Sequence, residues 1–118
     1  VAHDSHHMIV VGTCHENMAM AANCLAKVGG GVTVWKDGSE LALVELPIAG
    51  LMSDAPAATI AAETSLMVQA MADCGCMLNN AFMQHSLLAL VVIPELRISD
   101  LGLVDVTKFE ITSVLKGA

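Results

Sequence analysis

Val32-Thr-Val-Trp-Lys-Asp-Gly-Ser-Glu-Leu-Ala-Leu-Val-Glu-Leu46 is the stretch that decides the fold. Its two halves are rich in β-branched and apolar residues, which favour strands. Between them, Asp37-Gly38 supplies two residues that tolerate positive φ, and this pair is typical of a tight hairpin turn. We therefore expect strands at 32–35 and 41–46, joined as a β-hairpin.

Helical periodicity flanks this hairpin on both sides. Before it, apolar residues recur at helical spacing from Met18 to Val28, and Gly29–Gly31 is expected to end that helix. Thr13 to Glu16 has the spacing of a capping box at its start. After the hairpin, Asp54 is the expected N-cap of a second helix, whose apolar face runs from Ile60 to Met71. The sequence thus predicts two helices around the hairpin.

Further apolar runs predict additional strands. Met8–Val11 and Leu87–Ile93 have the length of buried strands, and Leu96–Ile98 and Lys108–Val114 have that of shorter ones. The order of elements contains no regular βαβ repeat, so we expect an α+β fold. Residues 1–118 are expected to form a single domain, with an antiparallel or mixed β-sheet of about five to six strands and two helices packed on one face.

The composition excludes several classes of function. A net charge of −7 with five Lys and Arg leaves no basic patch for a nucleic-acid backbone. No apolar run approaches the roughly 18 residues of a membrane span. With 55% hydrophobic and 14% charged residues, we expect an exposed apolar surface that another domain or chain covers. Four cysteines without Cys-x-x-Cys spacing indicate reduced thiols in a cytoplasmic protein.

Titratable residues gather at His3-Asp-Ser-His-His7. Imidazoles and a carboxylate are ligand types of transition metals, so His3, His6 and His7 are candidate metal ligands. In an extended strand, Asp4 and His6 share one face, whereas His3 and Ser5 share the other. The alternative interpretation is a polar strand entrance with partly exposed histidines. On these residues alone, a metal- or ligand-binding module that uses His3–His7 remains possible.

Several blocks of sequence resemble the C-terminal domain of bacterial adenine deaminases, in the same order and over nearly the whole chain. These blocks are Val1-Ala-His-Asp-Ser-His6 with Ile9-Val-Val-Gly12, Leu46-Pro-Ile-Ala-Gly-Leu-Met-Ser-Asp54, Leu88-Ala-Leu-Val-Val-Ile-Pro-Glu-Leu96, Asp100-Leu-Gly-Leu-Val-Asp105 and Lys108-Phe109.

This resemblance implies a part of an amidohydrolase-superfamily enzyme that hydrolyses adenine to hypoxanthine and ammonia. In that family a divalent metal (manganese, iron or zinc) activates water in an N-terminal (β/α)8 barrel of roughly 250 residues, for which this chain has no room. The resemblance therefore implies an accessory domain without catalytic residues of its own, inactive when isolated. Its implied partners are the barrel of the same polypeptide, adenine as substrate of the whole enzyme, and further copies in a homo-oligomer. His3, Asp4, Ser5 and His6 are then expected at the interface with the barrel, near the mouth of the active site.

The chain departs from the family pattern at four positions. His7 stands where Asn is usual, and Ala81 stands where Pro is usual. Gln84 and His85 stand where smaller or apolar residues are usual. These departures leave the expected fold unchanged, but they lie in the two segments that we place nearest a ligand.

Overall fold

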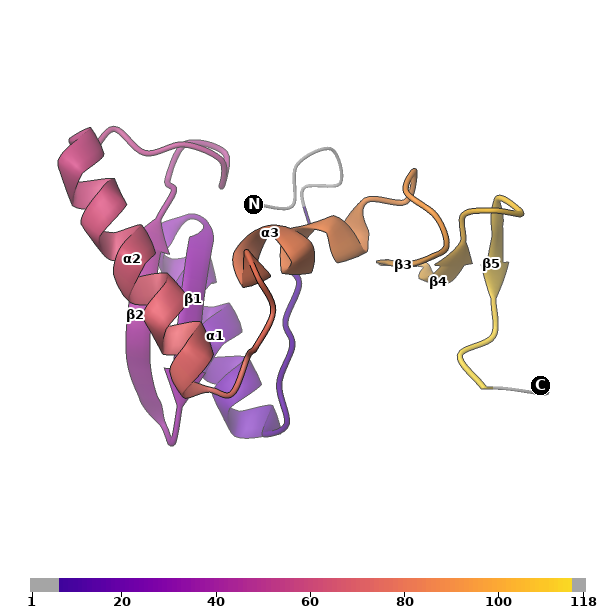
Figure 1. Cartoon of the computed structure of the whole chain (residues 1–118), viewed down its shortest axis with the longest axis horizontal. Coiled ribbons are helices and arrows are strands. Elements are labelled where there is room, and N and C mark those ends of the chain that lie inside the picture. Colours follow the sequence, from indigo (N-terminus) through magenta and orange to yellow (C-terminus); the bar gives the residue numbers. More distant parts are fainter. Residues whose placement is uncertain (1–6, 116–118) are drawn as a thin grey trace.

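The computed structural model describes residues 7–115, and within them the chain is α+β (Figure 1). The elements in chain order are helix α1 (His15–Val28), strands β1 (Gly31–Lys36) and β2 (Ser39–Glu45), helices α2 (Ala57–Asp73) and α3 (Ala81–Ser86), a 3-10 helix η1 (Leu87–Ala89), and strands β3 (Leu96–Ser99), β4 (Gly102–Asp105) and β5 (Glu110–Thr112). The expected α+β fold class is confirmed, whereas the expected sheet of about five to six strands is not matched exactly. The strands form two separate antiparallel sheets, β1-β2 and β3-β4-β5, in place of a single one.

The central hairpin forms as its sequence predicts. Strands β1 and β2 pair antiparallel from Gly31 opposite Glu45 to Lys36 opposite Ser39. Asp37 and Gly38 occupy the turn with φ values of 50° and 77°, the left-handed conformation that a two-residue hairpin turn requires. Hydrogen bonds to both neighbouring helices hold the turn end of the hairpin. Asn17 of α1 accepts a hydrogen bond from the Gly38 N–H at 2.9 Å, and Lys36 donates one to the C-terminal Asp73 carbonyl of α2 at 2.9 Å.

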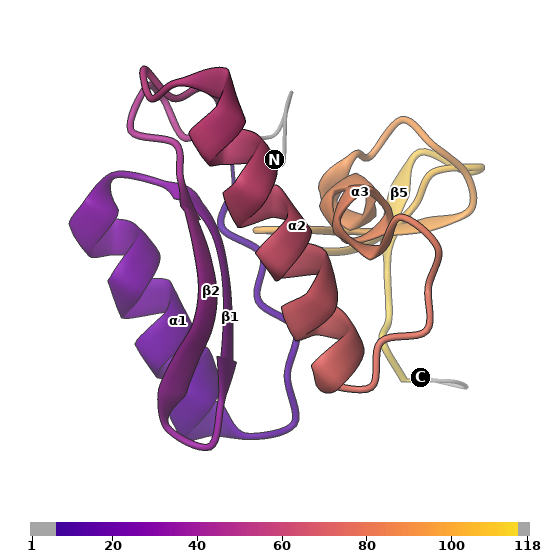
Figure 2. The same ribbon diagram turned by 60° about the vertical axis from the view of Figure 1, so that its left-hand side comes forward.

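Helices α1 and α2 lie on opposite faces of this hairpin (Figure 2), so the expectation of two helices on one face is wrong. On one face of the hairpin, α2 packs against Val44 and Ala42 of β2 and against Val32 and Val34 of β1. The other face meets α1, where Cys24 donates a hydrogen bond to Glu40. Apolar residues at successive positions of both strands give the hairpin two faces to bury, and each face takes one helix.

The main core forms on the α2 side of the hairpin. Its buried members are small or flexible apolar side chains, and Met67 is the most deeply buried of them at 2% exposure. The core consists of Ala42, Val44, Leu46, Met67 and Ala70. Two further residues of the described chain are buried outside it, Ala89 and Val106. A core of this size leaves much apolar surface exposed, as the composition predicts.

The segment before α1 differs from its prediction. Residues 8–11 form no strand, and the predicted capping box is absent. Cys14 is the N-cap residue, and its thiol donates a hydrogen bond to Glu16 at 3.1 Å. An apolar run of four residues does not specify which sheet edge it would pair with, so it cannot distinguish a strand from an extended segment. At the second helix, Pro56 and not Asp54 occupies the N-cap position.

The segment after α2 differs more. The predicted strand at 87–93 is wrong, because η1 and a turn occupy these residues, and α3 directly precedes them. A short apolar run fits a buried strand and a buried helical turn equally well. Strand β3 confirms the prediction at 96–98. The final strand is shorter than the predicted 108–114, and β4, which pairs with both of its neighbours, was not predicted.

Candidate functional site

The expected site residues His3, Asp4, Ser5 and His6 lie outside the described residues. Their placement near an active-site mouth therefore stays a prediction. His7, the last member of the cluster, is described and half-buried. It lines a cleft of about 420 Å³, which we call the histidine cleft. The cleft has three further walls: the C-terminal end of α1 with residues 29–33, the loop at 49–51, and residues of α3.

A close approach of two backbone segments shapes one side of the histidine cleft. Gly29 ends α1 in the left-handed conformation, and the N–H groups of Gly29 and Gly30 both donate to the Leu25 carbonyl. A Cβ on Gly30 would stand 2.6 Å from the Gly50 Cα, which no side chain tolerates. The missing side chain therefore brings the loop at 49–51 directly against the end of α1. The triple glycine thus ends a helix, as the sequence predicts, and also brings two chain segments together.

His85 of α3 provides the second imidazole of the histidine cleft. Its Nε2 atom is buried and has no hydrogen-bond partner among the described residues. Burial lowers the pKa of His85 below its ordinary value of 6.5, so the ring is neutral at pH 7. A neutral imidazole offers one donor and one acceptor nitrogen. His85 is thus ready to bond a group that the described chain does not itself supply.

The Ser86 hydroxyl, next to His85 in the sequence, does not form a catalytic Ser-His pair with it. Ser86 Oγ donates a hydrogen bond to the Met83 carbonyl at 2.8 Å. In a catalytic Ser-His pair the serine hydroxyl donates to the imidazole. The Ser86 hydroxyl donates to a carbonyl instead, so His85 does not accept its proton. The two other departures in this segment act locally, because Gln84 donates to the Asn79 carbonyl and Ala81 begins the helix. The histidine cleft thus offers hydrogen bonds and apolar walls, without covalent chemistry.

An apolar groove of about 540 Å³ lies beside the histidine cleft, between α2, the hairpin and the connector at 76–82. The two hollows share side chains of β1, the 49–51 loop, α2 and α3, and these are Val32, Leu51, Met71 and Phe82. The groove is lined mainly by aliphatic and Met side chains, which suit a flexible apolar surface. Phe82 and Met71 therefore line both hollows, of which only the histidine cleft carries imidazole side chains.

The His, Cys, Asp and Glu side chains of the described chain are its possible metal ligands. Across residues 7–115, no group of three or more His, Cys, Asp or Glu side chains is placed to hold a metal ion. Of the three candidate ligands, only His7 belongs to this part of the chain. All four cysteines are free thiols. Burial raises the pKa of Cys24, whose thiol donates to Glu40, so this group stays protonated at neutral pH. The described residues thus fit a site for hydrogen bonding and not a metal centre.

The convergence of His7 and His85 on one cleft was missed at the sequence level. They stand 78 positions apart in the printed sequence; His7 is a candidate metal ligand and a departure from the family pattern there, and His85 is a departure only. Nothing local in the sequence indicates that the two segments meet. In the part of the chain that the structure covers, no helix is long and apolar enough to cross a membrane.

Comparison with known proteins identifies the family. The profile of the adenine deaminase C-terminal domain matches residues 1–110. Curated relatives named adenine deaminase include that of Ruegeria pomeroyi, 75% identical over 98% of this chain, and that of Roseobacter denitrificans, 73% identical over 98%. The adenine deaminase of Moorella thermoacetica is 46% identical over 99% of the chain. No solved structure matches. The chain spans about 19% of the length of the first two relatives and 20% of the third, so all three carry further polypeptide. This chain belongs to the adenine deaminase C-terminal domain family.

Proposed function

We propose that this chain is the C-terminal part of a hydrolase that converts adenine and water to hypoxanthine and ammonia, cleaving the C–N bond of a cyclic amidine. One observation carries the proposal: two relatives named adenine deaminase match 98% of the chain at 75% and 73% identity. The match spans only about a fifth of those relatives. The reacting groups are therefore proposed to lie in the preceding polypeptide, in an amidohydrolase barrel.

A divalent metal, manganese, iron or zinc, supplies an activated water in that barrel under this proposal. The described residues of this chain do not fit a metal site, so no step of the reaction is assigned to them. Their role is to support the barrel and its oligomer in the cytoplasm. The alternative of a stand-alone metal- or ligand-binding module has no support in the comparisons, because the relatives are longer proteins named adenine deaminase.

The segment from His3 to His7 is proposed to meet the barrel near the mouth of its active site. Asp4 orients His6 through a hydrogen bond to one ring nitrogen in this proposal, which leaves the other nitrogen for the barrel or the substrate. His7 supports the placement indirectly. It lines the same cleft as His85, whose buried Nε2 has no hydrogen-bond partner among the described residues.

Ammonia release from adenine tests the proposed function. The full-length protein that carries this chain should release ammonia and hypoxanthine in equal amounts when it is loaded with Mn²⁺. The isolated 118-residue chain should not exceed a control that contains the metal alone. Two results would overturn the proposal: a full-length protein that leaves adenine intact, or an isolated chain whose turnover is abolished by substitutions within it.

A further inference from the structure

The three-stranded sheet β3-β4-β5 stands apart from the helices and the hairpin (Figure 1). Among the helices and strands of the described chain, it contacts only η1. A small antiparallel sheet needs one face buried against another layer to be stable. The hairpin has a helix on each face, whereas this sheet has no layer of comparable size over either face.

The strand register defines an apolar patch on one face of this sheet. Ile98 of β3 stands opposite Leu103 of β4. Leu96 lies two residues before Ile98 and therefore on the same face of the sheet. Leu96 and Ile98 each keep 50% of their surface exposed. We call Leu96, Ile98 and Leu103 the C-terminal apolar patch.

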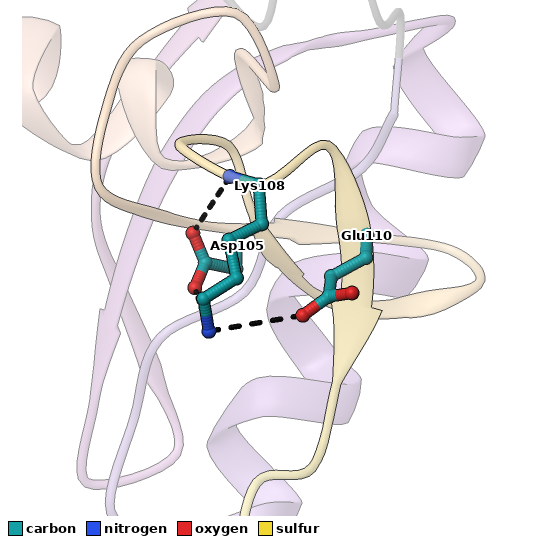
Figure 3. A network of polar contacts seen from close by, with 3 residues as sticks. All are labelled: Asp105, Lys108 and Glu110. Atoms are coloured by element: carbon teal, nitrogen blue, oxygen red, sulfur yellow. Dashed lines mark hydrogen bonds and ion pairs between the residues drawn. The ribbon is translucent and has the colours of Figure 1, made fainter.

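Charged residues border this patch on the same face. Leu96 stands opposite Asp105, and Asp105 stands opposite Glu110 on the far strand. The Lys108 ammonium lies 3.1 Å from the Asp105 carboxylate and 3.7 Å from that of Glu110, which fixes the three side chains together (Figure 3). The hydrogen bond from Lys108 also lowers the pKa of Asp105. An exposed apolar patch with a polar rim is typical of a protein–protein contact.

We propose that the C-terminal apolar patch packs against the part of the same polypeptide that precedes this chain. The inference rests on the proposed function, in that the chain is one part of a longer enzyme. About four-fifths of the relatives' length lies outside the matched region, which provides an occupant permanently tethered to the patch.

A second copy of the chain is a poorer occupant. Four carboxylates and two cationic side chains lie within residues 95–110, namely Glu95, Asp100, Asp105 and Glu110 with Arg97 and Lys108. The segment is therefore net negative. A two-fold contact brings the same net negative segment of both copies together, so the net electrostatic interaction between the copies is repulsive.

Thiol labelling of the full-length protein tests whether the patch is covered. Ile98→Cys places a thiol in the patch, and Leu66→Cys places one on the outer surface of α2, where Leu66 is 63% exposed. Native Cys74 is exposed and serves as an internal reference. Labelling by a maleimide is quantified for each peptide by mass spectrometry. We expect the thiol from Ile98→Cys to react at least about tenfold more slowly than the one from Leu66→Cys, because it is accessible only after local opening. Equal rates at the two positions would refute the proposal.

Cross-linking then identifies the occupant. A photoreactive benzophenone is attached to the introduced thiol after slow labelling, and unlabelled protein is mixed with isotope-labelled protein before irradiation. Cross-links from the patch to the preceding polypeptide within one copy support the inference. Cross-links that join a labelled to an unlabelled peptide would overturn it in favour of a second copy.

Controls for folding and for function complete the test. Each variant must retain the wild-type circular dichroism spectrum and melting temperature within about 3 °C, equivalent to less than about 1 kcal/mol. If Ile98→Cys fails this criterion, Leu96→Cys on the same face replaces it. Ammonia release from adenine is measured on the same samples. A covered patch in a protein that does not hydrolyse adenine would refute the proposed function and leave this inference standing.

Discussion

Met67→Ala tests whether the contact between α2 and the hairpin is the core of the domain. Met67 is 2% exposed and is the largest fully buried side chain among the described residues. The substitution removes Cγ, Sδ and Cε, which corresponds to roughly 2.4 kcal/mol of lost transfer free energy at about 0.8 kcal/mol per buried methylene-sized group. A cavity adds to this cost when the surroundings cannot collapse.

The cavity contribution should be small at this position. Met67 also lines the apolar groove beside α2, so the vacated space joins an existing hollow and Met71 can move into it. We therefore expect a total loss of about 2.5–3.5 kcal/mol in the free energy of unfolding, in the lower half of the range for a buried Met→Ala change.

Leu66→Ala is the matched control, since it lies next to Met67 on the same helix and is 63% exposed. It should change the free energy of unfolding by less than about 0.5 kcal/mol, because little area is lost and Ala is a strong helix former. Urea unfolding of the 118-residue chain, followed by circular dichroism, measures both variants. If the two free energies differ by less than about 1 kcal/mol with unchanged m-values, the core is not where we place it.

Three further predictions concern His85, Gly31 and the pair Asp4 and His6. Burial lowers the pKa of His85, so below pH 6.5 the unfolded chain binds more protons than the folded chain. The free energy of unfolding should therefore be greatest above pH 6.5 and fall as the pH drops through the pKa of the folded state. His85→Gln should flatten this part of a profile of urea midpoint against pH. Gly31→Ala should cost more than about 2 kcal/mol in the same assay, since a Cβ would collide with the Val44 carbonyl and φ is 141°; a wild-type midpoint would contradict the close approach. Asp4→Ala and His6→Ala in the full-length protein should each lower kcat/KM for adenine by about tenfold at unchanged metal content, and wild-type kinetics in both would show that the cluster has no role at the active site.

The elements that the sequence predicts well are those with local physical signals. Asp37-Gly38 specifies the hairpin turn because few other pairs tolerate its backbone conformation. Gly29 ends α1 for the same reason, and α2 follows a long helical repeat. These signals require no knowledge of the rest of the chain. They therefore predict the elements, but not how the elements pack.

The sequence of β2 carries a signal for the burial of the hairpin on both faces. Leu41-Ala-Leu-Val44 carries apolar residues at successive positions, whereas a strand with one wet face alternates them with polar residues. That pattern indicates helices on both faces, as the structure shows. By contrast, nothing comparable distinguishes the 87–93 run as helical, because it is too short to show a period of 3.6 residues.

The candidate site depends on contacts that no local pattern encodes. His7 precedes α1 and His85 belongs to α3, and they meet only because both segments reach the end of the hairpin at Gly29–Gly31. Two of the four departures from the family pattern, His7 and His85, thus line the same cleft. A buried, unpartnered Nε2 on one wall leaves this cleft incomplete within the described chain, and the C-terminal apolar patch is incomplete in the same sense. The cleft lacks a hydrogen-bond partner and the patch lacks an apolar cover, and a protein surface packed over them can supply both. The sequence of the domain therefore specifies its core and leaves two surfaces, which we propose the remaining polypeptide completes.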